Sequence, residues 1–186
     1  MTPMFLCKLL PGAVLIGFLS AAACLPACSS DNTANQSDPL SADVVREGQT
    51  TTLALDQFLR TTGDDWGWAG GTFDTPADGA VLPAATPTAF TWHADPTSGP
   101  NPNDTIVASK QNGQAFMLVF SSSSDPKLLR VFTSLTSYTP DAKAWQKLVA
   151  AGGPISVNVT SATFENDLLT SDGGPHIGQT ISITLQ

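Results

Sequence analysis

The sequence predicts one mainly β domain, an antiparallel β-sandwich with a single short helix, behind an N-terminal targeting segment. Three observations predict this fold. Apolar and polar residues alternate with a period of two over 155–160 and over 180–185. Turn signals rich in Pro, Gly and Asp separate many further short apolar runs. Only the stretch 140–151 has the apolar spacing of an amphipathic helix, so we expect two packed layers of strands.

Composition narrows the classes of partner. The chain has 186 residues, enough for one domain with tails, and it contains no internal repeat. Its formal net charge is −8, and only 13% of its residues are charged. Nucleic acids select basic surfaces, and so do anionic lipid headgroups, so neither is an expected partner of the folded domain.

The first 27 residues have the features of a secretory signal peptide. Lys8 precedes an apolar run over 9–23, which has the length of a signal-peptide core. The alternative is a permanent anchor helix, but a bilayer-spanning helix needs about 20 apolar residues. This run is shorter, so we expect a cleaved signal over 1–27.

The motif "LPAC", from Leu25 to Cys28, resembles the lipobox of bacterial lipoproteins. Leu25 and Ala27 occupy the aliphatic and small positions of that box, whereas "AAAC", ending at Cys24, lacks the leucine. The resemblance implies that Cys28 carries a thioether-linked diacylglycerol, with Cys24 as the alternative attachment site. Stable membrane anchoring needs at least two acyl chains, which a lipoprotein cysteine carries.

A polar segment follows the predicted lipid site. Residues 28–46 are rich in Ser, Asp and Asn, so we expect a disordered tether there. Serines, not aspartate, follow Cys28, as in lipoproteins that are sorted to the outer membrane. We therefore expect a lipid-anchored protein of the bacterial cell envelope, in the outer membrane. No cysteine follows Cys28, so neither a disulfide nor a zinc site is expected in the folded domain.

The domain is expected to span 47–186. Six runs are predicted strands, namely 50–56, 88–94, 115–121, 128–134, 154–161 and 179–186. The run 115–121 is apolar on both faces, which is typical of a central strand covered on both sides. The pair Asn112–Gly113 predicts a hairpin turn between this run and a strand over 105–109.

The helix over 140–151 has recognisable ends. Thr139 is the predicted N-cap with Pro140 at the first helical position, and two glycines from Gly152 end the helix. Its apolar face consists of Trp145, Leu148 and Val149. We expect Trp145 to be a core anchor, and Trp92 likewise.

Two longer stretches carry a resemblance to a family. The stretch "TPADGAVLPAATPTAFTWHA" over 75–94 resembles the opening of the Ig-like or fibronectin-III-like domains of bacterial surface lipoproteins. The stretch over 138–159 resembles their short helix and late strand. The resemblance covers 73–186, lacks the Cys–Trp–Cys core of antibody-type domains, and leaves open whether residues 47–72 add a strand. It implies a non-catalytic domain with a structural or protein-interaction role.

Residues that signal catalysis are sparse. His93 and His176 are the only histidines, and the sequence contains no GxSxG, HExxH, P-loop or GxGxxG motif. We therefore expect no catalytic residue, no cofactor and no metal, and the chain is not expected to be an enzyme. A small hydrolase built around one of the histidines is the weaker alternative. The loop over 95–104 offers oxygens for calcium, but it lacks EF-hand spacing and proline-rich turns use the same residues.

The stretch "GDDWGWAGG", residues 63–71, carries the clearest candidate ligand site. Trp66 and Trp68, with Asp64 and Asp65 beside them, have the composition of an aromatic platform that stacks on sugar rings. The alternative is that the two tryptophans plug one end of the sandwich, because tryptophans bury most of their area. A carbohydrate-binding surface module is thus the alternative function, and the expected partners are an envelope protein or a polysaccharide.

Overall fold

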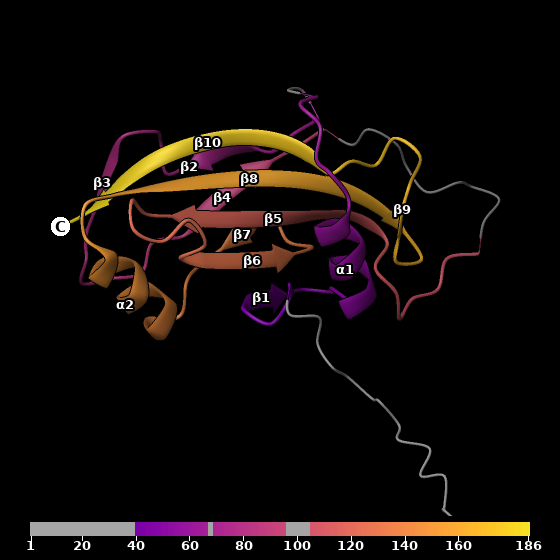
Figure 1. Ribbon diagram of the computed structural model, residues 1–186, viewed down its shortest axis with the longest axis horizontal. Helices are drawn as coiled ribbons and strands as arrows, with labels where there is room; N and C mark the ends of the chain where they lie inside the picture. Colours follow the sequence, from indigo (N-terminus) through magenta and orange to yellow (C-terminus); the bar gives the residue numbers. More distant parts are fainter. Residues whose placement is uncertain (1–39, 67–68, 96–104) are drawn as a thin grey trace, which may run out of the picture. The chain divides into compact units, whose positions relative to one another are not determined.

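The computed structural model describes residues 40–66, 69–95 and 105–186 (Figure 1). All of them belong to the unit Gln36–Gln186. The signal peptide, Cys24, Cys28 and Trp68 lie outside the described residues, as does most of the loop over 95–104. No helix in the described part of the chain is long and apolar enough to span a bilayer.

Two sheets and two helices make up the described residues. The larger sheet has seven strands. Six of them lie side by side in the order β1 (Val44–Glu47), β6 (Leu129–Thr133), β5 (Gly113–Ser121), β8 (Pro154–Glu165), β10 (His176–Leu185) and β3 (Ala80–Leu82). The seventh, β9 (Leu168–Leu169), pairs with β8. The smaller sheet contains β2 (Thr72–Thr75), β4 (Phe90–His93) and β7 (Ser137–Tyr138). The helices are α1 (Thr52–Arg60) and α2 (Ala142–Ala151). The mainly β prediction is confirmed.

The expected antiparallel pairing holds only in part. The pairs β5–β6, β5–β8 and β8–β10 are antiparallel, as are both pairs of the smaller sheet. However, β1 pairs with β6 in parallel, and β3 pairs with β10 in parallel. Both exceptions are short outer strands that join the sheet from distant parts of the sequence.

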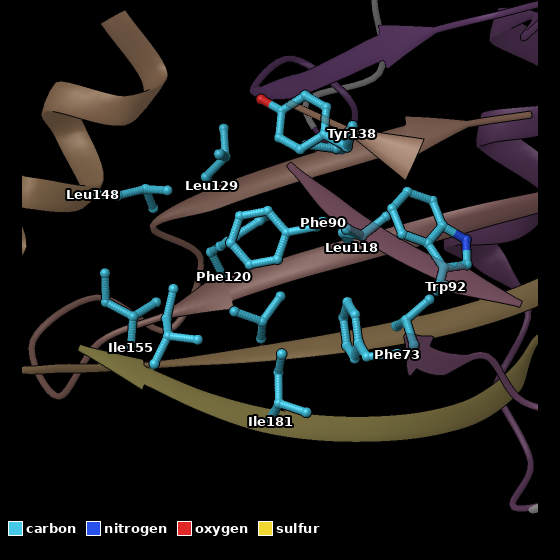
Figure 2. Packing of buried hydrophobic residues seen from close by; sticks show 14 of the residues in the cluster. Phe73, Phe90, Trp92, Leu118, Phe120, Leu129, Tyr138, Leu148, Ile155 and Ile181 are labelled. Carbon is cyan, nitrogen blue, oxygen red and sulfur yellow. The ribbon is translucent and has the colours of Figure 1, made fainter. Parts of the chain in front are cut away.

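The larger sheet is covered on both faces. On one face, Phe116, Leu118 and Phe120 of β5 belong to a cluster shared with the smaller sheet and α2. Figure 2 shows part of this cluster, in which Phe90 meets Phe120 edge-on at a centroid distance of 5.1 Å. On the other face, Ala115 and Met117 pack with α1. This double burial confirms that β5 is a central strand.

Period-two alternation predicted β8 and β10 correctly. Ile155, Val157 and Val159 are fully buried, and Ile181 and Ile183 are buried in the same cluster. The predicted runs 88–94 and 128–134 correspond to β4 and β6. Trp92, on β4, is 1% exposed, as expected of a core residue.

The predicted strand over 50–56 is wrong, because these residues begin helix α1. Thr51 caps this helix, and its hydroxyl accepts a hydrogen bond from Ala54 N at 3.1 Å. Leu55 and Phe58 are buried one turn apart, whereas Leu53 is 49% exposed. The alternation of Leu53 and Leu55 therefore covered too few residues to distinguish a strand from the first turn of a helix. The expectation of a single helix is corrected accordingly.

The predicted hairpin at Asn112–Gly113 is also wrong, because residues 105–109 form no strand. The side chain of Asn112 instead joins two loops: its Nδ2 donates to Val107 O, and its Oδ1 accepts from Asn166 N at 2.7 Å. The two-residue hairpin loop lies at Asn166–Asp167, between β8 and β9, where both residues have positive φ. Positive φ at both central positions is the geometry of a type I′ turn.

The folded part begins earlier than the predicted boundary at residue 47. A turn over 40–43 leads into β1, so the last residues of the predicted tether over 28–46 belong to the larger sheet. Arg130 of β6 is 7% exposed and donates hydrogen bonds to the carboxylate of Asp43 and to Leu40 O. A buried guanidinium needs such acceptors, which explains why this polar segment is ordered.

Helix α2 forms where it was predicted. Its N-cap is Asp141 and not Thr139, because the Asp141 carboxylate accepts from Ala144 N at 2.7 Å. Gly152 ends the helix with φ +62°. Trp145 is 3% exposed and its Nε1 donates to Ala84 O at 2.8 Å, so its role as a core anchor is confirmed.

Candidate functional site

The segment around the tryptophan motif lies against the start of β10 through backbone hydrogen bonds. Asp64 N donates to Pro175 O at 2.9 Å, and Ile177 N donates to Asp64 O at 2.8 Å. Further along, Gln179 N donates to Gly71 O at 2.7 Å. These bonds, together with an isolated bridge between Asp64 and His176, hold the backbone against β10 at Asp64 and at Gly71.

Glycines make this close approach possible. A Cβ on Gly178 would lie 2.3 Å from the backbone N of Gly71, and a Cβ on Gly70 would lie 2.4 Å from Ile177 O. Neither distance is compatible with a side chain. Gly70 of the motif and Gly178 of β10 therefore allow the two backbones to pack directly against each other.

His176 lies beneath this segment and is only 2% exposed. Its Nδ1 lies 2.6 Å from Oδ1 of Asp64, and its Nε2 lies 3.0 Å from the backbone oxygen of Asp172. A carbonyl oxygen accepts only, and a carboxylate accepts when ionised. Both ring nitrogens are therefore engaged, one by a side chain and the other by the backbone.

Trp66 stacks on this fixed histidine. The two ring centroids are 5.1 Å apart and the ring planes differ by 14°. Trp66 is nevertheless 42% exposed, and the carboxylates of Asp64 and Asp65 are exposed beside it. For Trp66 this exposure favours the platform interpretation over the plug, whereas Trp68 lies outside the described residues.

Sequence reasoning did not find His176 as part of this cluster. His176 and Asp64 are 112 positions apart, and no local pattern links them. Sequence analysis had assigned Asp64 to the candidate platform, but it gave no partner for His176.

His93 has a different environment. Its Nδ1 lies 2.7 Å from Oδ1 of Asp74, and the two side chains are 63% and 49% exposed. His93 therefore faces solvent. Within the described residues, no group of three or more His, Cys, Asp or Glu side chains is placed to hold a metal ion.

A groove of about 380 Å³ lies between the edge strand β1 and helix α2. It is lined by Val45, Leu129, Asp141, Lys143, Ala144 and Lys147. Val45 is 38% exposed, while Leu129 belongs to the core between the two sheets. The groove therefore combines an apolar floor with a polar rim, a combination typical of binding sites. No sequence signal pointed to it, because β1 was assigned to the tether.

Acidic groups lie beside this groove. Burial raises the pKa of Glu47 above its usual range, and the nearby Asp141 carboxylate raises it further. The pKa of the Tyr138 hydroxyl is also raised, first by burial and then by the charges of Glu47 and Asp141. Asp141 lines the groove, and Glu47 is the last residue of β1.

Known proteins supply no relative from which a role carries over to these residues. Comparisons with protein-family models, with curated proteins and with solved structures find no match. Any assignment of function rests on the chemistry of the described side chains and on the N-terminal sequence.

Proposed function

We propose that this chain is a lipid-anchored protein of the bacterial cell envelope whose domain binds a partner protein and does not catalyse a reaction. In this proposal the lipid is attached at Cys28, with Cys24 as the alternative, and the protein resides in the outer membrane. The support is the signal sequence with its "LPAC" box. The two sheets are proposed to form an Ig-like sandwich, which the cluster shared by both sheets supports.

The histidines support binding over catalysis. A general base needs an accessible nitrogen within reach of substrate. Both ring nitrogens of His176 are held by Asp64 and Asp172, and the ring is buried. The Asp74–His93 pair stands on an open surface, and neither residue lines the groove beside β1. The hydrolase alternative therefore has little support in the arrangement of these side chains.

The observation that carries the proposal is the groove beside β1. It has an apolar floor at Val45 and Leu129, a charged rim, and a sheet edge next to it. Apolar grooves with polar rims, and sheet edges, are surfaces that protein partners use.

Photo-crosslinking in intact cells tests this proposal. A photoreactive amino acid replaces Val45 in the full-length chain, and a matched variant carries it at Val81 on β3, at the opposite edge, where the side chain is 61% exposed. We expect a discrete protein adduct from position 45 and none of that size from position 81. Identical adducts from both positions, or no adduct at position 45, would contradict the proposed role.

A carbohydrate-binding module is the second candidate, and the half-exposed Trp66 favours it. An indole held rigidly on a buried ring, with carboxylates beside it, suits stacking on a sugar with hydrogen bonds to its hydroxyls. Calorimetric titration with envelope polysaccharide fragments tests this function. Binding that is lost in Trp66→Ala and kept in Val81→Ala would support it, and no binding by the unmodified chain would reject it.

A further inference from the structure

Strand β1 ends the larger sheet. In the described part of the chain, β6 is its only pairing partner, so one row of backbone N–H and C=O groups faces outward. Val44 packs with the α1 cluster and Arg46 Nη1 donates to Thr52 on α1. Side chains alternate along a strand, so Val45 points to the opposite face, where it lines the groove.

Positive charge borders the groove in an otherwise acidic protein. The chain has eight Lys and Arg residues against sixteen Asp and Glu, yet two of its lysines line this one site. Lys143 and Lys147 are exposed and stand four positions apart on α2, so they share one face of the helix. Asp141 also lines the groove, but its carboxylate is engaged by the N-terminus of α2 through Ala144 N.

From this arrangement we propose that the groove takes an extended, acidic segment of a partner protein, which adds as a strand to the outer edge of β1. The inference rests on the proposed binding role and specifies its ligand. Backbone hydrogen bonds to β1 supply affinity, and every second side chain of the added strand points into the groove. Apolar side chains of the segment then lie on Val45 and Leu129, while its carboxylates meet Lys143 and Lys147.

The choice of an acidic peptide follows from charge and shape together. The lysines attract negative charge, but the net charge of −8 opposes nucleic acid. Because the apolar floor and the lysines line the same groove, the matching segment carries both apolar and acidic side chains at its groove-facing positions.

Defined peptides test the inference on the purified full chain. The probe, called the Glu–Val peptide, is the fluorescein-labelled octapeptide Val-Thr-Glu-Thr-Val-Thr-Glu-Thr, in which Val and Glu share one face of the strand. The controls are the same peptide with Lys in place of Glu and the same peptide with two central prolines. We expect the Glu–Val peptide alone to raise the fluorescence anisotropy, with binding that weakens as salt is added. Proline removes the N–H donors that strand addition needs, so the second control isolates that requirement. Equal binding of the Glu–Val peptide and either control would overturn the inference.

Variants then locate the binding. Lys143→Gln with Lys147→Gln should weaken peptide binding roughly tenfold, because two charge pairs are lost. Lys110→Gln removes the same charge in the loop before β5 and should leave binding unchanged. Both lysines of α2 are exposed, so matching thermal melts exclude misfolding. Undiminished binding by the double variant would refute the proposed site.

The two failures are distinguishable. Crosslinking from position 45 reports any protein partner, whatever its charge. A position-specific adduct combined with no preference for the acidic peptide rejects the acidic strand and leaves the binding role standing. Absence of the adduct rejects the binding role itself.

Discussion

Asp64 Oδ1 and His176 Nδ1 lie 2.6 Å apart, and this contact joins the tryptophan segment to the start of β10. The histidine is buried, while the carboxylate is half exposed. The imidazole also supports the indole of Trp66 from below. One carboxylate therefore contacts a buried ring that in turn stacks against the exposed indole of Trp66.

Replacing Asp64 should remove the contact between the tryptophan segment and β10. Asp64→Ala leaves a buried imidazole nitrogen without its hydrogen-bond partner, so the free energy of unfolding should fall by roughly 1–3 kcal/mol. Urea unfolding followed by tryptophan fluorescence measures this loss. Asp65→Ala is the matched control, because Asp65 is exposed and adjacent in sequence. Equal stabilities of the two variants would show that the Asp64–His176 contact contributes nothing measurable.

The lipid site is predicted from the N-terminal sequence. Cys28→Ser should abolish labelling by a clickable fatty acid and release soluble or unprocessed protein, because the serine hydroxyl does not replace the thiol. Cys24→Ser should leave labelling intact, since cleavage before Cys28 removes residue 24. Loss of labelling in Cys24→Ser alone would assign the lipid to Cys24.

The core of the fold could be predicted from sequence where a pattern extended over a whole element. In β8, apolar residues alternate from Ile155 to Val159, and in β5 both faces are apolar, so strand type and central position followed directly. The strand prediction over 50–56 was wrong because Leu53 and Leu55 have the two-residue spacing of a strand. Phe58, which is buried one helical turn after Leu55, lies outside that range.

The candidate sites were harder to predict, because each depends on residues far apart in the chain. The ring beneath Trp66 comes from His176, and β1 gains its strand identity only by pairing with β6. A four-residue outer strand preceded by polar residues has the local composition of a tether. Nothing in that composition revealed that Arg130, more than eighty residues away, would bind Asp43.

Trp145 should be among the residues most important for stability. Its indole is buried with Leu148 in the core between the sheets, and its Nε1 donates to Ala84 O. Trp145→Ala should lower the unfolding free energy by roughly 3–5 kcal/mol, the cost of removing a large buried aromatic. Thermal melts test this, with Val81→Ala as an exposed control. An unchanged midpoint for Trp145→Ala would contradict its role in the core.

The position of the domain boundary has a direct consequence for truncation. A chain that starts at Gln36 keeps β1 and Asp43, whereas one that starts at Glu47 loses both. The shorter chain leaves the guanidinium of Arg130 buried without its carboxylate and should be less stable by roughly 2 kcal/mol or more. Chemical denaturation of the two fragments compares them. Equal midpoints would mean that residues 36–46 add nothing to the fold.

The Asp43–Arg130 pair should also give a specific dependence of stability on pH. The hydrogen bond from Arg130 holds the pKa of Asp43 below the ordinary aspartate value of 3.8, although burial partly opposes the shift. A carboxyl with a lowered folded-state pKa contributes stability above the unfolded pKa, and this contribution is lost as pH falls through the folded value. Asp43→Asn should therefore be less stable than the unmodified chain at pH 6, and the difference should shrink below about pH 3.8.

Glu47, at the other end of β1, should behave with the opposite sign and serves as the control. Its pKa is raised, by burial first and then by Asp141, so its contribution to stability is present below the ordinary glutamate pKa of 4.5 and is lost as pH rises through the folded-state pKa. Glu47→Gln should accordingly match the unmodified chain in acid and become the more stable of the two at pH 7. Urea midpoints between pH 2.5 and 7 measure both variants. Parallel pH profiles for Asp43→Asn and Glu47→Gln would contradict these opposite environments, because the pKa values of the two carboxyls would then be shifted in the same direction.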